Sequence, residues 1–213
     1  IIGDIIVFVL KRMDKKKNIP ILHKLYGAFI IGIAVTAAST GFSVYGTIHA
    51  RQMTTRSYDI SVDKHVDDIS SLNVVLVADL HLGYSIGCSD MEKMVDRINA
   101  LNPDVVIYAG DIFDNDYDAL DDPERLVEIM RNVSAAYGSY AVFGNHDVTE
   151  TLVGGFSTAS RTKAFRDPRM ETFLEQAGIN IMLDEVTTIA DGKINLIGRL
   201  DGEKAGDGTS NRK

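Results

Sequence analysis

An apolar run that ends in an acid and an imidazole constrains the fold of this chain more than any other stretch. Val74–His81 begins with four aliphatic residues, a composition typical of a strand buried in a sheet, and closes with Asp79 and His81. Because strand side chains alternate with period two, we expect Asp79 and His81 to point to the same side and to bind one ion together. The stretch therefore predicts a buried strand with metal ligands at its carboxyl end.

Two later segments repeat this arrangement. Val105–Asp111 is a second apolar run that ends in an acid, and Ser139–Phe143 leads directly into Gly144-Asn145-His146-Asp147. The carboxyl ends of parallel strands meet at one edge of an α/β sheet. We therefore expect these polar residues to gather at the same edge as the ligands of the first strand.

Helical periodicity and capping signals place helices between these strands, and turn signals place further strands after them. The predicted helices run from a capping box at Ser89 and Glu92 to Asn102, from Asp122-Pro123 towards Gly138, and from Asp167-Pro168 to Gly178. The additional predicted strands are Tyr58–Val62, Asn180–Leu183, Val186–Ala190 and Lys193–Ile197, the last two joined by a hairpin at Asp191-Gly192. Alternating strands and helices followed by antiparallel strands indicate an α/β domain.

The acidic charge of the chain limits its partners. The sequence contains 30 acidic and 22 basic residues, a formal net charge of −8, and no long basic face. This balance argues against a nucleic-acid-binding protein, which neutralises phosphates with Lys and Arg. A phosphate-binding enzyme with this charge needs metal ions to offset its own carboxylates. The single Cys88 excludes an intramolecular disulfide.

A long uncharged stretch predicts a transmembrane helix. No Asp, Glu, Lys or Arg occurs from Leu25 to Ala50, and about 20 helical residues suffice to cross the hydrocarbon core of a bilayer. We expect the helix at residues 25–48, after a partial membrane segment and a basic loop at 1–24. The positive-inside rule places that loop in the cytoplasm and the rest of the chain outside. A cleavable signal peptide that ends near Thr36-Ala37-Ala38 is the alternative.

Three short motifs follow one another at the predicted strand ends: Asp79-x-His81, Gly110-Asp111, and Gly144-Asn145-His146-Asp147. Their order and spacing resemble the calcineurin-like metallophosphoesterase family, and Asp79–Gly83 is similar to the opening motif of its membrane-anchored bacterial members. The resemblance implies an αββα sandwich, in which two facing sheets are covered by outer helices. It places this domain at residues 72–213, after a linker with a first strand at 49–71.

The resemblance also implies a site for two divalent metal ions, and Mn, Fe or Zn suits its carboxylate, amide and imidazole ligands. Asp79 and His81 would hold one ion, Asp111 would bridge both, and Asn145 would hold the other. A water that bridges the two ions would lose a proton near neutral pH and attack phosphorus as hydroxide.

Two further residues receive catalytic roles from the same resemblance. His146 would face the substrate phosphate, stabilise the charge of the transition state and protonate the leaving group, and Asp147 would orient it. Asp114 falls where the family often carries a further acid beside its ligands. The implied activity is hydrolysis of a phosphodiester or pyrophosphate-type bond at the outer face of the cell membrane. A lipid-linked or cell-envelope substrate would suit that location.

The sequence departs from the family towards its carboxyl terminus. The family completes its site with a later His and a Gly-His-x-His block, whereas no histidine follows His146 here. We expect the domain to be incomplete at this end, which leaves both ions short of imidazole ligands. The alternative is a catalytically inactive, membrane-bound binding or sensing module with the same fold.

Overall fold

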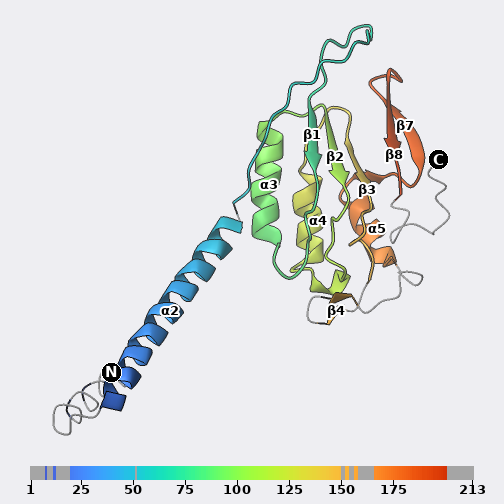
Figure 1. The fold of residues 1–213 in the computed structure, drawn as a ribbon. Coiled ribbons are helices and arrows are strands. Elements are labelled where there is room, and N and C mark those ends of the chain that lie inside the picture. Colours follow the sequence, from blue (N-terminus) through green and yellow to red (C-terminus); the bar gives the residue numbers. More distant parts are fainter. Residues whose placement is uncertain are drawn as a thin grey trace. The chain divides into compact units, whose positions relative to one another are not determined.

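The computed structural model describes residues 8, 12, 20–50, 52–149, 152–153, 156–157 and 166–200 (Figure 1). Residue contacts divide the chain into two units, Ile1–Ile60 and Ser61–Lys213. Each unit is described by itself.

Helix α2 (Pro20–Ala50) dominates the first unit (Figure 1). Its segment Tyr26–Ala50 has 25 residues and is long and apolar enough to cross a membrane. At 1.5 Å per residue, such a segment reaches about 37 Å, which exceeds the hydrocarbon core of about 30 Å. Ile30, Ile31 and Ile33 point in different directions and are all exposed, so the helix has no single buried face. A helix is present where the sequence predicts one, it is apolar enough to span a membrane, and it extends beyond residues 25–48 at both ends.

A four-stranded parallel sheet with the strand order β1-β2-β3-β6 forms the centre of the second unit (Figure 1). The register pairs Ala109, the last residue of β2, with Val142, the last residue of β3. Val77 at the end of β1 pairs with Tyr108, one residue before the end of β2. Because three strands end at nearly the same level, the segments that follow them meet at one edge. The strands are β1 (Val74–Val77), β2 (Val105–Ala109), β3 (Ser139–Val142) and β6 (Ile179–Ile181).

Helices α3 (Cys88–Ala100), α4 (Pro123–Arg131) and α5 (Pro168–Gln176) cover one face of this sheet (Figure 1). Tyr108 of β2 belongs to the same buried cluster as side chains from all three helices. Met91, Leu126 and Phe173 are among them. The chain passes through a helix between successive parallel strands, as expected for βαβ units.

Aspartates begin two of the helices, as predicted. The carboxylate of Asp122 accepts a hydrogen bond from the Arg125 backbone nitrogen at 3.1 Å, and that of Asp167 accepts one from the Arg169 backbone nitrogen at 2.9 Å. In each case a proline follows in the first helical turn, where a missing N–H removes no helical bond. The local sequence alone therefore determines where α4 and α5 begin.

Two local predictions are wrong. Helix α3 begins after Gly87, which makes no side-chain cap, so Ser89 lies inside the first turn and forms no capping box. The described residues 52–73 contain no strand, and Tyr58 and Ile60 are 75% and 82% exposed. The alternating polarity of Tyr58–Val62 does not produce a strand, because its apolar side chains are exposed.

The predicted hairpin after the parallel sheet is confirmed. Strands β7 (Glu185–Ile189) and β8 (Ile194–Gly198) pair antiparallel around a turn that contains Asp191 and Gly192. The described residues also include a 3₁₀ helix, η1 (Tyr117–Ala119), and a short antiparallel pair, β4 (Leu152–Val153) and β5 (Phe156–Ser157). Parallel and antiparallel sheets with covering helices confirm the α/β class.

Replacement of Phe173 by alanine tests this core. Phe173 is 1% exposed and its ring meets that of Phe113 edge-on at 5.4 Å, so Phe173→Ala should lower the free energy of unfolding by about 3–5 kcal/mol. Thr172→Ala, on the exposed side of the same helix, should change it by less than about 0.5 kcal/mol. Urea unfolding in detergent, followed by tyrosine circular dichroism, measures both. Equal losses in the two variants would contradict the assigned core.

Candidate active site

The strand ends that carry predicted ligands turn sharply. Asp79 and His81 after β1 have φ angles of 53° and 48°, and Asp111 after β2 has a φ angle of 50°. Residues other than glycine rarely adopt this left-handed conformation, although Asp, Asn and His do so more readily than most. Backbone strain of this kind collects at functional sites. These φ angles agree with the prediction of a functional site at the ends of β1 and β2.

The turns bring three predicted metal ligands together. One ligand atom from each of Asp79, His81 and Asp111 lies within 4.8 Å of the others. Strand β1 ends at Val77, so alternation along a strand does not explain why Asp79 and His81 meet. That interpretation is wrong, because both residues lie in a turn with positive φ angles. Two carboxylates and an imidazole at this spacing have the donor chemistry that divalent transition metals require, so these residues fit a metal ion.

Backbone hydrogen bonds hold the segments after β1 and β2 side by side. The Asp79 nitrogen donates to the Gly110 oxygen at 3.3 Å, and the His81 nitrogen donates to the Asp111 oxygen at 3.0 Å. The backbone of the two segments therefore sets the spacing of the three ligands.

Two glycines allow the segments after β2 and β3 to touch. A Cβ atom on Gly110 would lie 2.9 Å from the Cα atom of Gly144, and one on Gly144 would lie 2.6 Å from the Asp111 nitrogen. Both distances are shorter than real Cβ contacts. In this arrangement the His146 backbone N–H donates to Oδ1 of Asp111 at 2.8 Å. The Gly-Asp and Gly-Asn-His-Asp motifs thus pack against each other, as the sequence predicts.

His146 and Asn145 follow this glycine contact. The ring of His146 is partly exposed and lies edge-on to that of His81, with 5.0 Å between the ring centroids. The structure therefore brings His146 beside the three-ligand cluster. Asn145 is exposed and directly precedes it in the chain, and its role as a metal ligand stays a prediction.

Asp114 extends the cluster on the other side of His81. Its Oδ1 atom lies 3.6 Å from Nδ1 of His81. One ligand atom from each of His81, Asp114 and His146 also lies within 4.8 Å of the others. A carboxylate near the second nitrogen of a metal-binding histidine commonly fixes the ring orientation, and Asp114 is placed to do this for His81.

Asp147 contacts the backbone instead of His146. Its carboxylate is fully buried, with Oδ1 accepting from the Phe113 nitrogen at 2.8 Å and Oδ2 accepting from the Gly144 nitrogen at 2.7 Å. Burial raises the pKa of Asp147 to about 6, although these two N–H groups act to lower it. The prediction that Asp147 orients His146 is therefore corrected. Asp147 joins the segments that follow β2 and β3.

The side chain that contacts the His146 ring is Asn115, which the sequence analysis did not single out. Its Nδ2 atom lies 2.7 Å from Nδ1 of His146, and the residue is 1% exposed. The one sequence feature that points to Asn115 is its position four residues after Asp111. This position does not indicate a contact with His146, which lies 31 residues further along the chain.

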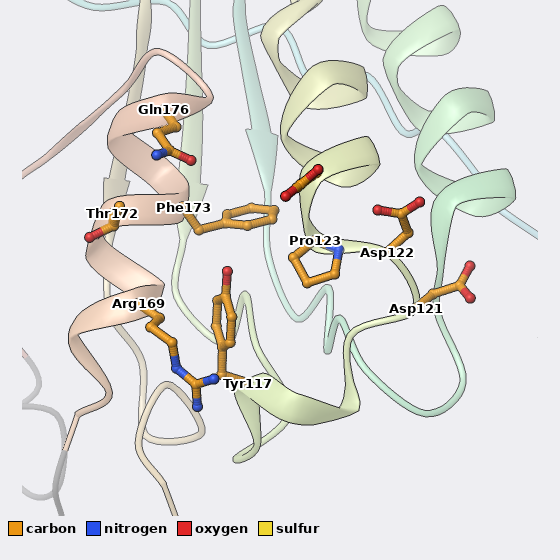
Figure 2. Close-up of a pocket in the computed structure, with 9 residues that line it drawn as sticks. Tyr117, Asp121, Asp122, Pro123, Arg169, Thr172, Phe173 and Gln176 are labelled. Carbon is orange, nitrogen blue, oxygen red and sulfur yellow. The ribbon is translucent and has the colours of Figure 1, made fainter.

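A surface depression of about 640 Å³ lies between η1 and helices α4 and α5 (Figure 2). Asp121 and Arg169 are among the residues that line it. The Arg169 guanidinium lies over the ring of Tyr117 at 4.6 Å and pairs with Asp118 at 2.6 Å, so its charge is already balanced. The predicted ligands do not line this depression, and its acidic wall would repel a phosphate ester. We therefore locate the candidate active site at the strand ends.

The fold and the site together define a class of protein, an α/β protein with a cluster of carboxylates and imidazoles that fits a metal ion at the carboxyl edge of a parallel sheet. The family model described as calcineurin-like phosphoesterase matches residues 72–203, and the chain belongs to this family. The resemblance drawn from the three motifs is confirmed. Members of the family use divalent metal ions, in agreement with the ligand cluster.

Several curated proteins are similar to this chain. A transmembrane protein with metallophosphoesterase domain from Danio rerio is 31% identical over 163 residues, which cover 71% of this chain and 36% of that protein. The uncharacterized metallophosphoesterase YkuE of Bacillus subtilis is 26% identical over 150 residues, with coverages of 70% and 49%. The UDP-2,3-diacylglucosamine pyrophosphatase LpxG of Chlamydia trachomatis is 29% identical over 104 residues, with coverages of 47% and 31%.

The relatives are longer than the part that matches this chain, and one of them is named as a membrane protein. The matched part of this chain spans between 31% and 49% of their lengths. The relative from Danio rerio is named as a transmembrane protein, and this chain contains a helix that could span a membrane. Together these two findings suggest that the protein is associated with a membrane.

Replacement of Gly144 by alanine should separate the packed motifs. The added methyl group would meet the Asp111 backbone at 2.6 Å, so Gly144→Ala should weaken binding of Mn²⁺ by at least about 10-fold and lower the free energy of unfolding by about 1–3 kcal/mol. Isothermal titration with Mn²⁺ and urea unfolding measure the two effects.

Gly87→Ala is the matched control. Its added methyl group meets the carboxylate of Asp121, which can rotate away, so Mn²⁺ affinity should stay within about 2-fold of wild type. Unchanged Mn²⁺ affinity in Gly144→Ala would contradict the proposed packing of the two motifs around a metal site.

Proposed function

We propose that the protein hydrolyses a phosphate ester with the help of two divalent metal ions. The observation that carries this proposal is the convergence of Asp79, His81 and Asp111 within 4.8 Å at the strand ends. Membership of the calcineurin-like phosphoesterase family supports a hydrolase. Because this chain matches less than half of each of the three relatives described above, the activity is proposed for the whole protein.

Each proposed ligand has a distinct task. Asp79 and His81 would hold one ion, Asp111 would contribute to both ion sites, and Asn145 would help to hold the second ion. Oδ1 of Asp111 accepts the His146 N–H, so the orientation of this carboxylate is fixed before any ion binds. Such ions, when bound, neutralise charge on the phosphate and lower the pKa of a water that acts as the nucleophile.

His146 is the proposed contact to the substrate phosphate. Its ring is partly exposed beside the ligand cluster, where a phosphoryl oxygen can approach it. A hydrogen bond from this ring stabilises the negative charge that develops in the transition state. Asp147 has a supporting task, because its two backbone contacts hold the segments that carry Asp111 and His146.

The proposed substrate contains a phosphodiester or pyrophosphate-type bond and is presented at a membrane. Helix α2 is apolar enough to tether the protein to a bilayer. One relative is named a UDP-2,3-diacylglucosamine pyrophosphatase, and the acyl groups in that name denote a lipid-like substrate. The basic residues that precede α2 support an extracytoplasmic location for the active site.

Removal of the bridging carboxylate tests the reaction. The full-length gene product, assayed in detergent with Mn²⁺ and an aryl phosphodiester, should lose activity about 10³-fold or more in Asp111→Asn, because charge stabilisation worth several kcal/mol depends on this ligand. Asp96→Asn, on the exposed side of α3, should retain wild-type rates. Full activity in Asp111→Asn would rule out the bridging role. A wild-type protein that fails to hydrolyse diesters and pyrophosphates with Mn²⁺, Fe²⁺ or Zn²⁺ would rule out the proposed function.

A cysteine on α5 tests the orientation in the membrane. Glu175→Cys in a Cys88→Ser background should react with a membrane-impermeant maleimide in intact cells, because Glu175 is exposed and we place the domain outside. Cys88 itself is a poor reporter, since desolvation and the nearby Asp121 raise the pKa of its thiol. Labelling that occurs only after lysis would contradict the extracytoplasmic location.

A further inference from the structure

Asn115 is a buried residue with two contacts to His146. Its backbone nitrogen donates to the His146 oxygen at 3.1 Å, and its side-chain Nδ2 lies 2.7 Å from Nδ1 of the His146 ring. Asn115 is 1% exposed, whereas the ring that it contacts is partly open to solvent. The backbone and the side chain of one residue thus fix both the position and the ring of the proposed phosphate-binding histidine.

The direction of the side-chain hydrogen bond determines where the ring carries its proton. When Nδ2 of Asn115 donates, Nδ1 of His146 must accept through its lone pair, and a neutral ring then carries its proton on Nε2. In this orientation Oδ1 of Asn115 is a buried acceptor without a partner among the described residues. The reversed amide would place Oδ1 against Nδ1 of His146 and would require the ring proton there, so the orientation of the Asn115 amide decides which nitrogen is protonated.

The protonated nitrogen determines what His146 can do. Ligand atoms of His81, Asp114 and His146 lie within 4.8 Å of one another, so a cation could recruit His146 as a ligand. A neutral ring whose Nδ1 accepts from Asn115 and whose Nε2 carries a proton has no lone pair left for a metal. Such a ring can instead donate from Nε2 to an oxygen of the substrate.

We propose that Asn115 is a positioning residue that holds His146 as a hydrogen-bond donor through Nε2 and keeps it out of the metal coordination. This inference rests on the proposed function, in which His146 faces the substrate phosphate. Asn115 has a φ angle of 59°, a conformation that Asn tolerates better than most residues, and this keeps its amide against the ring.

Two substitutions separate this role from simple packing. Asn115→Asp keeps the size of the side chain and tolerates the same φ angle, but its carboxylate can only accept a hydrogen bond from an N–H at Nδ1 of His146. Asn115→Gly also tolerates the φ angle and keeps the backbone contact to the His146 oxygen, but it removes the amide. In NMR spectra, the imidazole signals that disappear in His146→Gln are those of His146.

The first measurement determines which nitrogen of the His146 ring carries the proton. It uses the whole chain, labelled with ¹⁵N, in detergent and without added metal. At about pH 8, wild-type His146 should show the Nε2–H pattern in long-range ¹H–¹⁵N spectra. A ¹⁵N–¹⁵N coupling across the hydrogen bond from Asn115 Nδ2 to His146 Nδ1 should accompany it. Asn115→Asp should convert the pattern to Nδ1–H. An Nδ1–H pattern in the wild type, or a wild type without this coupling, overturns the proposal whether or not the variants fold.

The second measurement uses the kinetics of the full-length gene product. Asn115→Gly should lower kcat about 10²-fold with little change in KM, because the donor to the transition state is no longer fixed. In a His146→Gln background the same substitution should cause no further loss of kcat. An additional loss in that background overturns the positioning role. A wild-type protein without activity would rule out the proposed function, and the NMR result would still decide the proton position.

Discussion

The buried carboxylate of Asp147 is the interaction on which the rest of the site depends. It accepts N–H groups from Phe113 and Gly144, which follow two different strands, so one side chain anchors both segments. A buried N–H without a partner costs about 1–3 kcal/mol. The two contacts of Asp147 therefore contribute about as much to the stability of the fold as the burial of one core side chain. The glycine contact between the same segments leaves no room for either to shift. Asp111 and His146 are therefore held in place by groups that take no part in the chemistry.

The site concentrates negative charge at one edge of the sheet. Asp79, Asp111 and Asp114 gather there with two histidines, although like charges at close range disfavour the folded state. A divalent cation that binds only the folded arrangement would stabilise it by mass action and offset this repulsion. The buried, helix-covered face of the sheet supplies the apolar contacts beneath this edge.

The sequence predicts the parts of this structure that depend on neighbouring residues. The Asp-Pro starts of α4 and α5, the hairpin at Asp191 and the apolar strands all follow from local patterns, and the three motifs at strand ends identify the site. The failures depend on contacts between distant residues. The alternation at Tyr58–Val62 has no buried face to occupy, and the contact of Asn115 with His146 joins residues 31 apart. Likewise, the period-two argument for Asp79 and His81 fails because their turn depends on hydrogen bonds to the segment after β2.

The left-handed backbone of Asp79, His81, Asp111 and Asn115 has a consequence for redesign and for natural variation. A left-handed residue other than Asn, Asp, His or Gly costs roughly 1–2 kcal/mol, so Glu and Cys are disfavoured at these four positions whatever their affinity for an ion. The repertoire of donors is thereby limited to short oxygen and nitrogen side chains. An engineer who wished to convert this centre into a thiolate site for softer metals would have to rebuild the turns before changing a single ligand.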